Sequence, residues 1–425
     1  MIWIVASVFL FTIFIGIPVS FALGLTAFCG FLLSGLPMSK MVIRTFTSID
    51  TFPLLAGPFF ILAGEIINRA NITGKIIKFA EALVGHIRGG LAFTNVMASM
   101  FFAGISGAAV ADVAALGKIE IDMMTEGGYE KDFSTAVTIA SSVAGPIIPP
   151  SVIMVIYAMA ASISVGGLFM AGILPGILLC FSLMIACYVY ARKRGYKVAN
   201  DSFSLKRIFV VGKDVFWYLL LPFIIIGGII SGVFTATESG NVGCAYAILL
   251  ALSTKSLKLK ELFRAFVRAG IITSVVIIII SMASALSWFM AIEQIPQKVI
   301  GMLEPLAESP LAFLLVFNVL LLIVGTFLEP GAAIIILVPV LLPLFDTIGL
   351  HPLHIGMIMV LNLTIGLITP PVGICIYVGS AIANLPVEKV IKATFPFILV
   401  LIVVLMIVTY VSKISLLIPE IFGFM

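Results

Sequence analysis

Residues 145–151 read Gly-Pro-Ile-Ile-Pro-Pro-Ser, and residues 366–372 read Gly-Leu-Ile-Thr-Pro-Pro-Val. Both segments lie inside long apolar stretches that suit membrane helices. In a helix each N–H donates to the carbonyl four residues back, and proline has no N–H. The paired prolines therefore leave four carbonyls without their helical partners, those of Gly145, Pro146, Gly366 and Leu367. Because an unpaired carbonyl is costly in hydrocarbon, each segment predicts a broken helix whose oxygens another group satisfies.

The composition of the whole chain is that of a membrane protein. Of its 425 residues, 62% are hydrophobic and 10% are charged, whereas an ordinary soluble domain is about 45–50% apolar and about 25% charged. So few charged side chains cannot give a globule a solvated surface. This excludes a cytosolic enzyme, a secreted disulfide scaffold and a nucleic-acid-binding protein. We therefore expect an all-α polytopic membrane protein.

The apolar stretches indicate both complete and partial membrane crossings. A spanning helix needs about 20 apolar residues, and several stretches are too long for one span or contain Gly and Pro. We expect roughly 10–12 crossing or half-crossing elements. The stretches are 2–34, 50–67, 91–117, 134–160, 168–190, 215–252, 270–291, 310–345, 354–382 and 395–418.

The charged residues between these stretches indicate the orientation of the chain. Loops 191–213 and 253–268 are rich in Lys and Arg and should be cytoplasmic, which requires an even number of crossings in 215–252. Two amphipathic segments, 72–84 and 296–306, suit helices that lie along the membrane surface. The five cysteines are scattered singly, so neither a disulfide nor a transition-metal site is expected.

The chain repeats itself at an offset of 221 residues. Gly104 falls on Gly325, and Pro175 falls on Pro396. The predicted topology gives the two copies opposite directions, and such inverted repeats are typical of secondary transporters with a site at the bilayer midplane. The expected repeats are 1–213 and 214–425. Their elements are a re-entrant hairpin at about 91–117, a broken helix at about 134–160, a cytoplasmic loop at 191–213, a second hairpin at about 310–345, a second broken helix at about 354–382 and a last helix at 395–418.

The hairpin tips should face the broken helices. Freed carbonyls and the Thr369 hydroxyl are oxygen ligands that suit Na⁺, and Pro330 frees the carbonyl of Thr326 as well. A tip also presents free N–H groups, which suit a carboxylate substrate. The alternative is that each hairpin is one kinked spanning helix. Asp112 and Glu238 are intramembrane candidates, but helix capping explains them about as well.

Several motifs together resemble the large membrane subunit of tripartite ATP-independent periplasmic (TRAP) transporters, of the DctM or SiaM type. They are Ser-Gly-Ala-Ala-Val-Ala-Asp at 106–112, residues 145–151, Gly-Val-Phe-Thr-Ala-Thr-Glu at 232–238, residues 329–339, and Thr-Pro-Pro-Val-Gly at 369–373. The resemblance implies a bacterial inner-membrane importer that uses a sodium gradient and an elevator mechanism, with a scaffold and a transport domain. It also implies a periplasmic binding protein, a separate four-helix membrane subunit and an organic acid as substrate.

The resemblance also implies the site residues. We expect one sodium site at Ser106, Gly145, Ile148 and Pro149, and a second at Gly325, Thr326, Gly366 and Thr369. We expect the substrate near Ser106, Gly107, Glu329, Pro150 and Pro371. Position 108 is Ala where some relatives have a second hydroxyl, so one ligand is lost there or comes from the backbone.

Two other functions remain open at this point. One is a stand-alone sodium/dicarboxylate symporter that needs no binding protein, and the other is a channel-forming or structural subunit without coupling to a gradient. No ATP-binding or protease motif is present, so we expect no enzyme and no cofactor apart from Na⁺ as the coupling ion. For the substrate the prediction leans towards sialic acid over a C4-dicarboxylate, although no single residue decides it.

Overall fold

The computed structural model describes residues 2–50, 52–70, 72–196, 203–295, 298 and 310–424, and every regular element in these ranges is helical. The all-α expectation is confirmed. The first half contains α1 (Ile2–Phe14), α2 (Val19–Leu33), α3 (Met38–Thr47), η1 (Phe52–Leu55), α4 (Ala56–Arg69), α5 (Thr73–Val84), α6 (Gly90–Ser106), α7 (Ala109–Glu126), α8 (Lys131–Ser141), η2 (Ser142–Ala144), α9 (Val152–Ala160) and α10 (Val165–Lys193). The second contains α11 (Leu205–Ile230), α12 (Ala236–Ser253), α13 (Leu259–Ile292), α15 (Pro310–Phe327), α16 (Pro330–Ile348), α17 (Pro352–Gly366), α18 (Ile374–Ala383), α19 (Val387–Tyr410) and α20 (Lys413–Ile421).

The helix pattern repeats along the chain. Adding the offset of 221 to the bounds of α6 through α10 reproduces the bounds of α15 through α19 to within four residues. For example, α7 at 109–126 maps onto 330–347, and α16 occupies 330–348. One difference stands out upstream, where α3 and α4 are separated by residues 48–55 while their counterpart, α13, is one continuous helix of 34 residues.

Both broken helices are present. The first runs through α8 and η2, loses helical structure over 145–151 and resumes as α9, and the second ends at Gly366 and resumes as α18 at Ile374. Both hairpins are also present, with α6 turning into α7 at 107–108 and α15 turning into α16 at 328–329. Hairpin 1 extends beyond the predicted 117, because α7 continues through a more polar segment to Glu126.

Other boundaries differ from the prediction. Stretch 215–252 divides between α11 and α12, which is an even number of helices, but α11 starts at Leu205, so the loop predicted at 191–213 is shorter. The predicted last helix at 395–418 is wrong as a single element, because the chain bends at 411–412 between α19 and α20. Segment 72–84 is the amphipathic helix α5, whereas 296–306 lies outside the described residues apart from Lys298.

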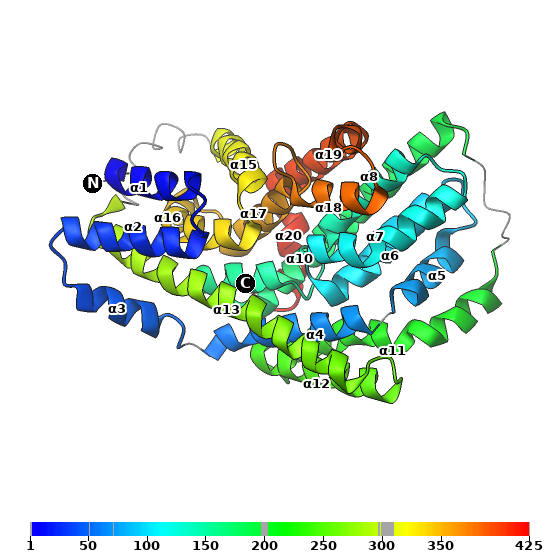
Figure 1. Cartoon of the computed structure of the whole chain (residues 1–425), viewed down its shortest axis with the longest axis horizontal. Coiled ribbons are helices and arrows are strands. Elements are labelled where there is room, and N and C mark those ends of the chain that lie inside the picture. The colour runs from blue at the N-terminus through cyan, green and yellow to red at the C-terminus, as the bar shows by residue number, and fades with distance from the viewer. Residues whose placement is uncertain are drawn as a thin grey trace.

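The helices pack as two groups. In Figure 1, α3, α4, α11 and α12 lie along the lower side, whereas α15, α17, α18 and α19 lie along the upper side. We call α1–α4 with α11–α13 the outer group, and the hairpins and broken helices with α10 and α19 the inner group. Within the inner group the two halves interlock, because α9 packs against α16 of the other half and α18 packs against α7. Both hairpins therefore belong to one packed body.

Polar contacts join each hairpin to the broken helix of its own half. In the first half, Asn95 of α6 donates from Nδ2 to Thr138 Oγ1 of α8 at 2.7 Å. In the second, Asn362 of α17 donates from Nδ2 to Asn318 Oδ1 of α15 at 2.8 Å. All four residues are buried, and a buried hydrogen bond between helices is costly to break because its partners then lose all pairing. Each hairpin is thus fixed against its broken helix.

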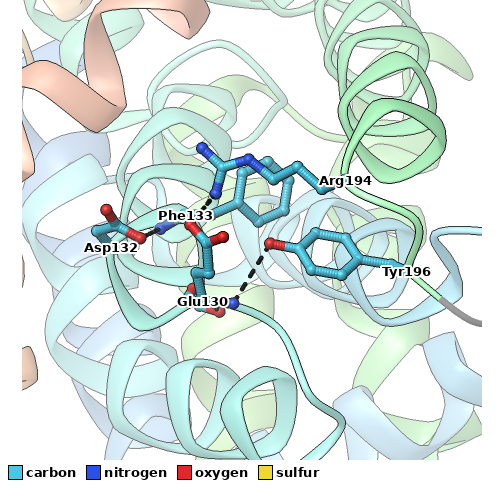
Figure 2. Close-up of polar contacts among 6 residues, drawn as sticks. Glu130, Asp132, Phe133, Arg194 and Tyr196 are labelled. Carbon is cyan, nitrogen blue, oxygen red and sulfur yellow. Dashed lines mark hydrogen bonds and ion pairs between the residues drawn. The ribbon is translucent and has the colours of Figure 1, made fainter.

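A cluster of charged and aromatic side chains ties the start of α8 to the end of α10 (Figure 2). Arg194 forms an ion pair with Glu130, and its guanidinium lies over the ring of Phe133 at 5.4 Å. The Tyr196 hydroxyl accepts from the Glu130 backbone N–H at 3.3 Å. This cluster joins α8 to α10 at one end of the inner group, where the basic loop predicted at 191–213 begins.

Candidate functional site

The tip of hairpin 1 lies directly against the first helix break. Gly107 has φ +63°, in the left-handed region that favours glycine, and a Cβ there would lie 2.9 Å from the carbonyl oxygen of Pro150. A Cβ on Gly145 would lie 3.1 Å from the carbonyl carbon of Ala108 and 3.2 Å from the nitrogen of Ala109. Glycine is thus required on both sides, and the predicted meeting of tip and break is confirmed.

An acidic side chain lies inside this first contact. The Ser106 hydroxyl donates to Asp112 Oδ1. The other carboxylate oxygen, Oδ2, is buried without a hydrogen-bond partner among the described residues, and it faces Gly145 at 3.1 Å from the Cβ position. A buried carboxylate oxygen without a donor is unfavourable unless a cation or a proton satisfies it. The site therefore combines a hydroxyl, a carboxylate and the backbone at Gly145.

Helix capping does not explain Asp112. The N-cap of α7 is Ala108, and no side chain caps that end. Asp112 faces back across the Gly107 turn to Ser106. The sequence signal was a carboxylate six residues beyond a serine, with the turn glycine between them, and the expected site omitted it.

The tip of hairpin 2 makes an even closer backbone contact. A Cβ on Gly325 would lie 3.1 Å from the Cα of Leu363, and one on Gly366 would overlap the backbone of Gly325. Nearby, the hydroxyl of Thr326 donates to the carbonyl of Ile323 at 2.8 Å. The residues predicted for the second site thus lie at the contact between hairpin 2 and its break.

The hydroxyl of Thr369 is oriented so that it can accept a cation. It donates its proton to the carbonyl of Ile365 at 2.7 Å. A hydroxyl has two acceptor lone pairs besides its proton, and no donor among the described residues uses those of Thr369. The same holds for Ser106, whose proton is directed to Asp112. Ser106 at the first tip and Thr369 in the second break therefore each hold a hydroxyl oxygen whose lone pairs could bind a cation.

The expectation of bare carbonyls is correct for the first break and wrong for the second. Among the described residues no hydrogen bond reaches the carbonyl oxygens of Gly145 or Pro146. In the second break, Thr369 N–H donates to Gly366 O and Cys375 N–H donates to Leu367 O, both at 3.0 Å. The chain turns tightly there, and its own N–H groups replace the missing ones. The Gly366 oxygen keeps a second lone pair.

The remaining predicted sodium residues lie where the first break packs. A Cβ on Gly104 would lie 3.5 Å from the Pro149 carbonyl oxygen, so this oxygen lies at the hairpin. Ile148 instead packs its side chain against Gly176 of α10. Only the backbone of Ile148 is therefore placed to contribute to a cation site.

The predicted substrate residues do not all come together. Gly107 and Pro150 meet at the first tip beside Ser106. Glu329 is exposed at the second tip, and its Oε2 accepts the Ala332 N–H at 3.0 Å, which caps α16. A capping carboxylate competes with a substrate carboxylate for the same N–H groups. Pro371 is exposed at the second break.

A cavity of about 290 Å³ separates the outer group from the inner group. It contains none of the predicted site residues. Ile156 connects it to the second tip, since this side chain lines the cavity and lies 3.1 Å from the Cβ position of Gly331. The lining residues are Ser48, Leu54, Ile156, Met159, Ala160, Ile280, Ala283, Ser284, Ser287, Ile335 and Pro339. Three serines are the polar groups of an otherwise apolar wall.

The donor set suits a hard cation and not a transition metal. Within the described ranges no three His, Cys, Asp or Glu side chains lie close enough to hold a metal ion together. The available ligands are hydroxyl and carbonyl oxygens, with one carboxylate at the first site. Unwound backbone carbonyls at broken membrane helices are typical ligands of Na⁺ in transporters.

Comparison with solved structures shows the fold. The chain is similar to the YdaH transporter of Alcanivorax borkumensis, with a TM-score of 0.66 over 91% of this chain and 88% of that one, at 14% sequence identity. At this identity the likeness concerns the fold alone.

Comparison of sequences shows the family. The family model described as "Tripartite ATP-independent periplasmic transporter, DctM component" matches residues 6–414. The chain is 39% identical to the sialic acid TRAP transporter large permease protein SiaM of Vibrio cholerae, over 96% of each chain. It is 41% identical to the C4-dicarboxylate TRAP transporter large permease protein DctM of Pseudomonas aeruginosa, over 90% of each. This chain therefore belongs to the DctM component family of tripartite ATP-independent periplasmic transporters.

Proposed function

We propose that the chain is the sodium-coupled large membrane subunit of a TRAP importer for an organic anion. The observation that carries this proposal is that both hairpin tips meet a helix break, each with a hydroxyl oxygen whose lone pairs are unused. One site contains Ser106, Asp112 and the backbone of Gly145, Ile148 and Pro149. The other contains Gly325, Thr326, Gly366 and Thr369.

The proposal includes an elevator mechanism. The interlocked inner group carries both candidate sites and would move as one body against the outer group, with the cavity between them on the path of the substrate. The contacts of α9 with α16 and of α18 with α7 support this, because they join the two halves into one unit.

The proposed partners follow from the family. They are a periplasmic binding protein that delivers the substrate and a small membrane subunit. One relative, the isethionate TRAP transporter permease protein DctMQ of Oleidesulfovibrio alaskensis, is 39% identical over 94% of this chain, which covers 63% of that protein.

The substrate is proposed as a class, an organic anion. Relatives named for sialic acid and for C4-dicarboxylates are 39% and 41% identical to this chain, so the degree of similarity favours neither. Selection between such anions would lie in the binding protein.

Removing a hydroxyl from either site should weaken the sodium dependence of uptake. For Ser106→Ala and Thr369→Val we expect the sodium concentration for half-maximal uptake to rise at least about tenfold, because a ligand to a charged group contributes roughly 1.5–3 kcal/mol. The assay is uptake of labelled substrate into proteoliposomes that contain both membrane subunits, with the binding protein added outside.

Thr47→Val is the matched control. Its hydroxyl also donates to a backbone carbonyl of its own helix, but it is exposed on α3. Unchanged sodium dependence in both site variants would contradict the assigned sites. Full uptake without any binding protein would instead favour a stand-alone symporter, and flux without accumulation would favour a channel.

A further inference from the structure

Glu120 is a fully buried carboxyl group that the proposed transport cycle does not use. It lies on α7 with 0% of its surface exposed, and neither Oε1 nor Oε2 has a hydrogen-bond partner among the described residues. Residues 112, 116 and 120 recur at helical spacing, so Glu120 lies on the same face of α7 as Asp112, two turns further along. The Thr138 hydroxyl of α8 lies beside it.

The surroundings of Glu120 are polar but already paired. Thr138 Oγ1 accepts from Asn95 at 2.7 Å, and Asn95 Oδ1 accepts from Ser141 at 3.0 Å. Ser141 in turn accepts from Ser99 at 2.9 Å. These side chains form a network between α6 and α8, and the Thr138 hydroxyl, which accepts within it, still has its proton to share with the carboxyl group of Glu120.

Among the residues that the structure describes, no basic side chain pairs with Glu120. The charge that acts on it is that of Asp112, which is also acidic. Two other helices packed against α7 carry titratable groups. On α5, Lys75 lies over the ring of Tyr218 and Glu81 forms an ion pair with Arg207, and both partners belong to α11. On α18 the group is the buried thiol of Cys375. The N-terminal Asp132 of α8 accepts the N–H of Phe133.

A proton fits this site better than a metal cation. An unpaired buried carboxylate is strongly disfavoured, and either a proton or a cation would remove the cost. A cation needs several oxygen ligands, whereas the hydroxyl and amide groups here are engaged with one another. A proton needs no such set of ligands, and the Thr138 hydroxyl can donate to the oxygen of the carboxyl group that stays unprotonated. The second half has Leu341 at the equivalent position, so the site occurs once.

We propose that Glu120 is a proton-binding site whose occupancy is linked to the cation site at Ser106, Asp112 and Gly145, so that cation binding at the tip promotes release of the Glu120 proton. Eight residues of helix separate the two carboxyl groups by about 12 Å. At an effective dielectric constant of about 20, one added positive charge at that distance changes proton affinity by about tenfold. Linkage requires the proton to change cation affinity by the same factor.

The linkage rests on the proposed sodium coupling, whereas the protonation of Glu120 does not, and the two are measured separately. The first measurement is infrared spectroscopy of the full chain in lipid nanodiscs. We expect a protonated-carboxyl band in the wild type that is absent in Glu120→Gln and shifted in Thr138→Val. The control is Glu126→Gln, in which the band should remain, because the Glu126 carboxylate is exposed at the end of the same helix. An unchanged band in Glu120→Gln would show that Glu120 is ionised and overturn the proposal.

The second measurement is sodium binding by calorimetry in two buffers of different ionisation enthalpy. The wild type should release protons on binding and lose about tenfold in sodium affinity as the pH falls. Glu120→Gln should bind sodium with no proton release and little pH dependence. Equal proton release in both proteins overturns the proposal, as does the loss of one bound cation in the variant. Absence of sodium binding in every protein contradicts the proposed function instead, and the infrared result still stands.

Discussion

At the scale of single residues, the second candidate site depends on the space that Gly366 leaves. Its missing side chain lets the hairpin 2 backbone touch the end of α17, and Gly325 does the same from the other side. No other residue can occupy either position without moving one of the two backbones, because Gly366 is held by a helix and Gly325 lies in the last turn of α15. The close backbone contact between hairpin 2 and α17 therefore requires that both positions lack a side chain.

Substitution of this glycine tests that dependence. For Gly366→Ala we expect a destabilisation of about 1–3 kcal/mol from overpacking, together with loss of sodium-dependent uptake. The measurements are thermal unfolding in detergent and proteoliposome uptake. Gly270→Ala is the control, since this exposed helical glycine has open space around its Cβ position, and alanine there should be neutral or stabilising. Similar unfolding temperatures for both variants would contradict the packing argument.

At the scale of elements, the Arg194 cluster determines how firmly α8 and α10 are joined (Figure 2). Partial burial lowers the pKa of Arg194, but the hydrogen bond with Tyr196 and the charge of Glu130 raise it by more. Because the net shift in this pKa is upward, the stabilisation is complete below the unfolded-state value and is lost only as the pH rises through the still higher folded-state value. The cluster therefore stays charged throughout the neutral range.

Removal of the guanidinium should loosen this end of the inner group. For Arg194→Gln we expect a loss of about 1 kcal/mol, since a partly exposed ion pair contributes roughly 0.2–1 kcal/mol and a cation–π contact about 0.5–1 kcal/mol. The unfolding temperature should fall by a few degrees and lose part of its salt dependence. Arg192→Gln, an exposed position on the same helix, should change neither. An equal effect of both variants would show that net loop charge matters and the cluster does not.

Local chemistry made the broken helices predictable. Proline acts on the carbonyl four residues back whatever the fold, so the breaks after Ala144 and Gly366 follow from the sequence, and the 221-residue repeat places the hairpins beside them. The role of Asp112 was not predictable in this way. Its pairing with Ser106 depends on how the chain turns at Gly107, and the spacing alone allowed a cap. The hydrogen bond from Cys375 N–H to the Leu367 carbonyl likewise joins residues eight positions apart, across the irregular chain between α17 and α18.

At the scale of the whole molecule, the chain is a multi-pass protein of the bacterial inner membrane in which two helix groups meet at a cavity. The wall on the outer side includes Ser284 of α13, and the inner wall includes Ile335 of α16. The gap between α3 and α4 contributes Ser48 and Leu54 to the same cavity, at the place where the other half has a continuous helix. The cavity therefore lies where the two halves have diverged.

A cross-link across this cavity tests the elevator proposal. In Ser284→Cys/Ile335→Cys, a short bifunctional thiol reagent should join α13 to α16 and reduce uptake to background, because the inner group can no longer move. Sodium binding should persist, since neither residue is a proposed ligand. The variants Ser284→Cys and Ile335→Cys, each made alone and treated in the same way, should keep transporting. Normal uptake by protein that is shown to be cross-linked would exclude relative motion of the two groups at this interface.

The lone carboxylate of the first tip has an electrical consequence. Asp112 has Ala333 as its counterpart, so of the two tips only the first holds a buried carboxylate, whereas Glu329 at the second tip is exposed. While Glu120 keeps its proton, two bound sodium ions and a monovalent anion would bring the buried charge of the moving body close to zero, and the membrane voltage would then have little effect on the loaded state. Once unloaded the moving body would carry one negative charge, which an inside-negative voltage drives outward with about 2.3 kcal/mol per 100 mV. The voltage would then act mainly on the return stroke, and a divalent cargo would have to enter against it.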